Sequence, residues 1–175
     1  MKKIILITGG QRSGKSMYAE RLALSLTDQP IYFATARIWD EEFKERVKRH
    51  QARRGDNWTN IEEEKYLSHH TIYNKVCVVD CITLWCTNFF FDANQNNPKE
   101  PVIDEALDAI KKEFDQFTAQ DATFIFVTNE IGSGGVSDNV VQRRFTDMEG
   151  WMNQYVASKA DEVVLMVSGI PVKIK

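Results

Sequence analysis

The stretch GGQRSGKS, from Gly9 to Ser16, constrains this chain more than any other. It follows the apolar run Ile4–Thr8, which is typical of a buried strand, and precedes a stripe of apolar residues at helical spacing. It fits the pattern G-x-x-x-x-G-K-[ST], in which glycines let successive backbone N–H groups point at one phosphate near the positive end of the next helix. In that pattern Lys15 reaches the β- and γ-phosphates of a nucleotide and the Ser16 hydroxyl binds Mg²⁺. The stretch therefore predicts a site for a nucleoside triphosphate.

Further short apolar runs alternate with helical patterns along the rest of the chain. The runs are Ile31–Thr35, Val76–Asp80, Phe124–Thr128 and Val163–Val167. The helical stripes are Ala19, Leu22, Ala23 and Leu26; Ile103, Leu107, Ile110, Phe114 and Phe117; and Val141, Phe145, Met148, Met152 and Tyr155. Strands that are apolar throughout and separated by helices predict a mostly parallel sheet covered on both faces. The final PVKIK follows the last run too closely for a helical crossover, so it predicts an antiparallel edge strand. We therefore expect an α/β fold, a three-layer sandwich like that of P-loop NTPases, in a single domain over residues 1–175.

The net charge, the lack of a long apolar stretch and the cysteines limit the kinds of partner that the protein can bind and the cellular compartment in which it can lie. The formal net charge of −3 gives the chain no general attraction for nucleic acid, so any anion site must be local. No stretch approaches the roughly 20 apolar residues that span a bilayer. Cys77, Cys81 and Cys86 are odd in number and lack a second pair at metal-ligand spacing, so we expect buried reduced thiols. These features predict a cytoplasmic protein that binds neither nucleic acid nor a membrane.

Asp80 is the candidate for a second metal ligand. It ends the run VCVVD, and open α/β sheets bind their ligands at the carboxyl ends of strands. An acidic residue at such a position commonly holds a metal-bound water in P-loop enzymes. Two alternatives stay open: the carboxylate could cap a helix or turn that begins near Thr83, or it could contact a nucleotide base. Another run closes with Thr128, Asn129 and Glu130, followed by GSGGV, which indicates a loop that lines the same crevice.

The segment DEEFKERVKRHQARRGDNW carries a candidate nucleophile. On a helix, Arg46, His50 and Arg54 would lie at i, i+4 and i+8 and would share one face. Cationic neighbours favour the neutral imidazole, which is its nucleophilic form, and guanidinium groups can neutralise charge on a phosphoryl group under attack. The alternative is a solvated basic face that carries an incidental histidine. The other two histidines lack comparable neighbours and are interpreted as surface residues, His69 and His70.

Six stretches occur in order from the first expected strand to the last residue: ITGGQRSGKS, IYFATA, DEEFKERVKRHQARRGDNW, VVDCITLWCTN, VTNEIGSGGV and GIPVKIK. Together they resemble one enzyme family, the bifunctional adenosylcobinamide kinase/adenosylcobinamide-phosphate guanylyltransferases of cobalamin biosynthesis. The resemblance implies two reactions. A nucleoside triphosphate phosphorylates the aminopropanol hydroxyl of adenosylcobinamide. GTP then donates GMP to adenosylcobinamide phosphate through a guanylyl-histidine, with release of pyrophosphate.

The resemblance also implies site residues and partners. His50 corresponds to the histidine that carries GMP, and Lys15 belongs to the triphosphate loop. Glu62 and Asp80 correspond to acidic positions suited either to guanine or to metal, and both roles stay open. The nucleotide-binding residues that the resemblance implies are Gly9, Gly10, Gln11, Arg12, Ser13, Gly14, Lys15, Ser16, Ala34, Thr35, Ala36, Gln51, Ala52, Arg53, Arg54, Glu62 and Asp80. Ser16 and Asp80 would hold Mg²⁺ together with the nucleotide. GTP and ATP would be substrates, and the protein would form a homo-oligomer, a trimer.

The chain departs from the family's pattern at two places, and two rival functions use the same motifs. Gln11 stands where the family usually has a small residue, and Ser137 and Asp138 stand where Pro-Glu is expected after GSGGV. A P-loop kinase for another small metabolite would use the triphosphate loop and Asp80 without a covalent intermediate. A nucleotide-binding module without catalysis would use the arginine-rich segment to dock a partner. Label retained on the chain from GTP labelled at its α-phosphate would separate these functions.

Overall fold

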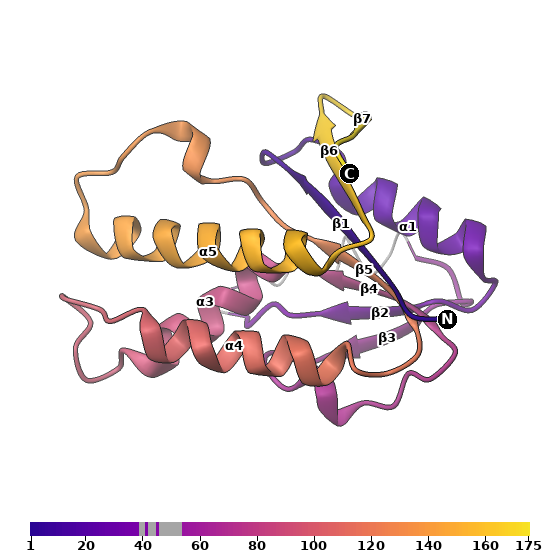
Figure 1. Cartoon of the computed structure of the whole chain (residues 1–175), viewed down its shortest axis with the longest axis horizontal. Coiled ribbons are helices and arrows are strands. Elements are labelled where there is room, and N and C mark those ends of the chain that lie inside the picture. The colour runs from indigo at the N-terminus through magenta and orange to yellow at the C-terminus, as the bar shows by residue number, and fades with distance from the viewer. Residues whose placement is uncertain (39–40, 42–44, 46–53) are drawn as a thin grey trace.

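The computed structural model describes residues 1–38, 41, 45 and 54–175, and these form a seven-stranded sheet with helices on both faces (Figure 1). The strands are β1 (Lys3–Gly9), β2 (Ile31–Ala34), β3 (Thr59–Glu62), β4 (Val76–Asp80), β5 (Thr123–Val127), β6 (Glu162–Val167) and β7 (Ile170–Lys173). The helices are α1 (Lys15–Leu26), α3 (Ile82–Ala93), α4 (Asp104–Phe117) and α5 (Val140–Lys159), with short 3₁₀ turns η1 (Leu67–His69) and η2 (Gly132–Gly134).

The sheet is parallel except at its C-terminal edge. The strand order is β3-β2-β4-β5-β1-β6-β7, and only the pair β6 and β7 is antiparallel. The chain reverses there through Ser168 and Gly169, whose φ angles of 50° and 83° match a two-residue turn of type I′. The predicted antiparallel return of the last residues is therefore confirmed.

The apolar strands are buried on both faces, which is why they lack a polar alternation. In β1, Ile4 and Leu6 belong to the larger core cluster, with residues of α3, α4 and α5. Ile5 and Ile7 belong to the smaller cluster, with residues of α1. Figure 1 shows the same division, with α4 and α5 on one side of the strands and α1 on the other. The predicted three-layer sandwich is confirmed, and the three cysteines are buried and free, as expected.

Two elements, β3 and α3, were not predicted from the sequence. β3 lies at the outer edge of the sheet, and Ile61 is its single apolar residue, so it lacks the composition of a strand. α3 has the opposite character: it buries residues around most of its circumference, including Trp85, Cys86, Phe89 and Phe90. A helix without a polar face gives no clear helical period in the sequence.

Candidate active site

The parallel register aligns many of the predicted site residues along one edge of the sheet. Asp80 pairs with Ala34 on one side and with Val127 on the other, and Ala34 pairs with Glu62. The next strand, β1, ends at Gly9, where the glycine-rich turn begins. The carboxyl ends of β3, β2, β4, β5 and β1 therefore form one row, the edge at which open α/β sheets bind ligands.

The glycine-rich turn runs from the end of β1 into the first turn of α1. Gly9 has a φ of 148°, and a Cβ at this position would lie 2.5 Å from the carbonyl oxygen of Met166, so the close approach to β6 requires glycine. Gly14 is the N-cap of α1 and has a φ of 94°. The carbonyl of Ser13 accepts a hydrogen bond from Gly169 N at 2.9 Å. The turn is thus held against β6 and the β6–β7 connection.

Lys15 is held inside this turn. Its side chain is buried, and Nζ donates to the carbonyl oxygen of Gly10 at 2.6 Å, with Ser13 Oγ at 3.5 Å. Burial lowers the pKa of Lys15, while the Asp80 carboxylate opposes that shift. The ammonium group therefore lies at the carboxyl edge within the electrostatic reach of Asp80, poorly hydrated and able to attract an anion.

Asp80 does not cap the helix that follows it. The N-cap of α3 is Cys81, whose sulfur accepts from Leu84 N at 3.5 Å, so the capping alternative is wrong. One Asp80 oxygen instead accepts a hydrogen bond of 2.7 Å from the Tyr32 hydroxyl. Burial and the Asp80 carboxylate raise the pKa of Tyr32, which keeps that hydroxyl protonated as the donor.

The Asp80 carboxylate and the Ser16 hydroxyl are hard oxygen donors, so they fit Mg²⁺ better than a soft metal. Ser16 is half-buried in the first turn of α1, and Asp80 is half-buried at the end of β4. Within the described ranges, no group of three or more His, Cys, Asp or Glu residues is arranged to hold a metal ion. An ion held by these two residues would take its other ligands from phosphate oxygens and water, as Mg²⁺ commonly does.

Arg54 is anchored inside the protein. Its side chain is only 2% exposed, and the guanidinium carbon lies 3.6 Å from the centroid of the Tyr32 ring. Nε donates to Asn60 Oδ1 at 2.7 Å, and Nη1 lies 3.8 Å from Glu20 Oε1. The side chain is thus engaged with α1, β2 and β3, through the same tyrosine that holds Asp80. Its contact with a nucleotide stays a prediction.

The remaining predicted nucleotide contacts differ in what their side chains do. Thr35 is fully buried, and its hydroxyl donates to the carbonyl of Cys81 at 2.8 Å and accepts from Cys81 N at 2.9 Å. Both hydrogen bonds are made to Cys81, the residue that follows β4, so Thr35 fixes the backbone there. Glu62 is exposed at the outer edge. Gln11 and Arg12 are exposed at the tip of the glycine-rich turn, and Ala34 and Ala36 are half-buried beside Thr35. The other predicted site residues, His50, Gln51, Ala52 and Arg53, lie outside the described residues, as does Arg46.

A buried polar cluster next to the turn was not anticipated from the sequence. The Thr83 hydroxyl donates to Glu149 Oε1 at 2.6 Å and accepts from the backbone and side-chain nitrogens of Asn129 at 3.0 and 3.2 Å. Glu149 is only 1% exposed. Burial raises the pKa of Glu149 to about 7, with a smaller contribution from Glu130, while the Thr83 hydrogen bond and Lys15 oppose the shift. The sequence does carry a signal for Glu149, because this acidic residue stands between the apolar residues Met148 and Met152 of the third helical stripe.

We expect Glu149→Gln to flatten the pH dependence of stability. Because the folded-state pKa of Glu149 is raised from 4.5 to about 7, the folded protein binds the proton more tightly than the unfolded chain. The stability that this tighter proton binding contributes is fully present below about pH 4.5 and is lost as the pH rises through about 7. At about 1.4 kcal/mol per pKa unit, the penalty of the buried carboxylate reaches at most about 3 kcal/mol at pH 8. Urea unfolding at pH 5 and pH 8 should show that the wild type loses more stability than the variant over this interval. Parallel losses in both proteins would contradict the assignment.

The two histidines outside the basic segment differ from each other. His69 is exposed and stacks on Tyr66, with ring centroids 5.3 Å apart. His70 is half-buried, with Nε2 3.5 Å from Glu63 Oε2 and its ring edge-on to Phe33. The surface interpretation therefore holds for His69, whereas the His70 side chain, 32% exposed, lies at the surface but also contacts β2 and the loop after β3.

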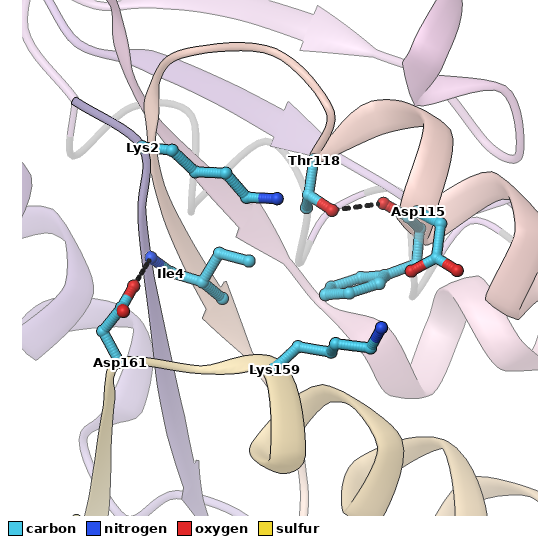
Figure 2. A pocket seen from close by; sticks show the side chains of 7 residues that line it. Lys2, Ile4, Asp115, Thr118, Lys159 and Asp161 are labelled. Atoms are coloured by element: carbon cyan, nitrogen blue, oxygen red, sulfur yellow. Dashed lines mark hydrogen bonds between the residues drawn. The ribbon is translucent and has the colours of Figure 1, made fainter.

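Two hollows on the described part of the surface lie away from the carboxyl ends of the strands. One, of about 230 Å³, lies at the amino ends of the strands, where Lys2 and Lys159 extend across it (Figure 2). Another, of about 460 Å³, lies between η1, α3 and α4 and includes Tyr66 and Phe89. Neither contains a residue of the glycine-rich turn. Within the described residues, no helix is long and apolar enough to cross a membrane.

The chain is similar to several known proteins. The chain is 38% identical to the bifunctional adenosylcobalamin biosynthesis protein CobU of Escherichia coli, over 98% of this chain and 99% of the relative. It is equally similar to CobU of Salmonella typhimurium, and 34% identical to CobP of Pseudomonas aeruginosa over 97% of this chain. A solved ATPase from the type III secretion system of pathogenic bacteria superimposes with a TM-score of 0.57 at 10% identity, which supports a P-loop ATPase-like fold alone. This chain covers 93% of its own length in that match and about half of the ATPase chain (50%). The family model described as cobinamide kinase / cobinamide phosphate guanyltransferase matches residues 5–174, and the chain belongs to that family.

Proposed function

We propose that this protein builds the nucleotide loop of cobalamin in two reactions. It phosphorylates the aminopropanol hydroxyl of adenosylcobinamide with a nucleoside triphosphate, and it then transfers GMP from GTP to adenosylcobinamide phosphate. The products are adenosylcobinamide-GDP and pyrophosphate. The observation that carries the proposal is the match to this family from residue 5 to residue 174, which includes the glycine-rich turn, most of β1 and the whole of every other strand.

In the phosphorylation step, the turn would bind the triphosphate and orient it. Backbone N–H groups between Gly9 and Ser16 would hold the phosphates at the start of α1, and Lys15 would neutralise charge on the β- and γ-phosphates. Ser16 and Asp80 would hold Mg²⁺, which when bound supplies positive charge to the phosphate oxygens. Positioning and charge neutralisation supply most of the catalysis in such reactions, so a strong general base is not required.

In the transfer step, His50 would act as the nucleophile. A neutral imidazole nitrogen attacks the α-phosphorus of GTP, a P–N bond forms, and the bond to the bridging oxygen breaks with release of pyrophosphate. A phosphate oxygen of adenosylcobinamide phosphate then attacks the same phosphorus and frees the imidazole. Gln51, Ala52 and Arg53 would contact the nucleotide beside His50. Asp80 lies near Lys15 and suits the metal, whereas Glu62 lies two strands away at the exposed edge and suits the guanine base.

The same proposal includes the setting of the enzyme. We place it in the cytoplasm as a homotrimer, with ATP or GTP as phosphate donor and GTP as the GMP donor. Light scattering of the purified protein measures the oligomeric state directly.

The experiment that tests the function follows the corrinoid by mass spectrometry. With Mg²⁺, ATP and adenosylcobinamide, we expect the corrinoid to gain one phosphoryl group. When GTP is added, we expect the phosphorylated corrinoid to gain GMP and pyrophosphate to appear in equal amount. Phosphorylation without GMP transfer would leave a simple P-loop kinase, and an unchanged corrinoid would remove both activities from the proposal.

A further inference from the structure

Asn129 lies in the middle of the row of strand ends. β5 separates β4, which ends at Asp80, from β1, which ends at Gly9, and Asn129 follows β5 by two residues. The backbone around it is fixed to the glycine-rich turn, because Glu130 N donates to the carbonyl of Gly9 at 3.0 Å. Asn129 is half-buried, and it lies at the same ends of the strands as Lys15 and Asp80.

Thr83 determines which way the amide of Asn129 faces. A hydroxyl has a single proton, and that of Thr83 is given to Glu149 Oε1 over 2.6 Å. The Thr83 oxygen can therefore only accept from Asn129, which it does from the backbone nitrogen at 3.0 Å and from Nδ2 at 3.2 Å. With Nδ2 directed to Thr83, the amide oxygen Oδ1 points away from the Thr83 hydroxyl.

One polar atom of Asn129 is left for a ligand. Its backbone nitrogen and Nδ2 are bonded to Thr83, and its carbonyl accepts from Asn153 Nδ2 at 3.2 Å. Asn153 is fixed in turn by a bond of 2.7 Å from the Thr128 hydroxyl. Within the described part of the chain, Oδ1 is the polar atom of this residue for which the structure gives no hydrogen bond. The backbone of Asn129 is fixed at two points and its side chain at one, which leaves one acceptor, Oδ1, preorganised for binding.

We propose that Asn129 binds the acceptor hydroxyl in the phosphorylation step and that Thr83 is its positioning residue, an assignment that rests on the proposed kinase function. Asn129 Oδ1 accepts the hydrogen bond of the alcohol and directs its oxygen at the γ-phosphorus. The new O–P bond forms while the bond between the γ-phosphorus and the bridging oxygen breaks, the nucleoside diphosphate leaves, and the alcohol proton is released to water. An amide oxygen is not a base, so Asn129 contributes orientation rather than proton abstraction.

The first test compares two substitutions of Thr83. Thr83→Val keeps the shape and removes the hydroxyl, whereas Thr83→Ser keeps the hydroxyl. We expect Thr83→Val to lower kcat for adenosylcobinamide phosphorylation about 10- to 100-fold, with the KM for the nucleotide changed less than about threefold. Thr83→Ser should restore most of that loss. The matched control is Thr87→Val, one turn further along α3, where the hydroxyl donates only to the carbonyl of Thr83.

The second test asks whether Thr83 acts through Asn129. Asn129→Ala should lower the same kcat about 10- to 100-fold, and the double variant should be no slower than Asn129→Ala alone. Because Asn129 is only half-buried, we expect Asn129→Ala to fold. This variant therefore tests the proposal even if Thr83→Val fails to fold.

The outcomes separate the two levels of the proposal. If the wild type phosphorylates adenosylcobinamide and Asn129→Ala does so at the same kcat, the assignment of Asn129 is overturned while the kinase function stands. A rise in nucleotide KM that accounts for the whole defect would also overturn it, because Asn129 would then serve the nucleotide. A wild type that leaves the corrinoid unchanged would overturn the kinase function and this assignment together.

Discussion

Replacement of His50 by alanine should abolish the covalent attachment of GMP to the chain. The wild type, incubated with Mg²⁺ and GTP labelled at the α-phosphate and then denatured, should retain label with the stability of a phosphoramidate, lost in acid and kept in alkali. Alanine has no nucleophile, so retained label should fall at least about 1,000-fold, to background. Transfer of GMP to adenosylcobinamide phosphate should be lost with it.

The control for this substitution is His69→Ala. His69 is the exposed histidine of the described chain and stacks only on Tyr66, so its replacement should leave the retained label unchanged. His50→Ala should also keep measurable phosphorylation of adenosylcobinamide, since that step uses the glycine-rich turn and needs no covalent histidine. Equal loss of both reactions would contradict the separate roles, and label retained on His50→Ala would place the nucleophile elsewhere.

The fold could be predicted wherever the sequence pattern depends on burial. The strands of the sheet interior are apolar because both of their faces are covered, and α4 and α5 show one apolar face because only one face packs. β3 and α3 could not be predicted from the sequence, for opposite reasons. The edge strand buries too little to need apolar residues, and the helix buries too much to show a polar face.

The site could be predicted in part because its motif constrains the backbone. The pattern of Gly9, Gly14 and Lys15 reflects local requirements, namely a positive φ, a close approach to β6 and a lysine inside a turn. The cluster of Thr83 and Glu149 brings together residues 66 positions apart in the sequence, and no local pattern reports such a contact. The buried state of Arg54 was missed for the same reason, because its partners lie on α1, β2 and β3.

Lys15→Ala should impair both reactions, in contrast to His50→Ala. The lysine is buried in the turn next to the start of α1, where a bound triphosphate would place its β- and γ-phosphates in either reaction. Removal of one charge that stabilises a transition state typically costs about 100- to 1,000-fold in kcat. We therefore expect losses of this size in adenosylcobinamide phosphorylation and in the rate of label retention from GTP.

A loss of folded protein should not account for the lower rates of Lys15→Ala. Burial lowers the pKa of Lys15, so the protein already opposes the charge at this position, and its removal relieves a desolvation cost. The variant should therefore unfold at a temperature no lower than about 4 °C below that of the wild type, the shift expected for about 1 kcal/mol in a domain of this size. The matched control is Lys75→Ala. Lys75 is exposed and precedes β4, at the amino ends of the strands and away from the glycine-rich turn, so its replacement should leave both rates unchanged. If Lys15→Ala slowed only one of the two reactions, the triphosphates of the two steps would have to bind at different places, and a shared glycine-rich turn would be excluded.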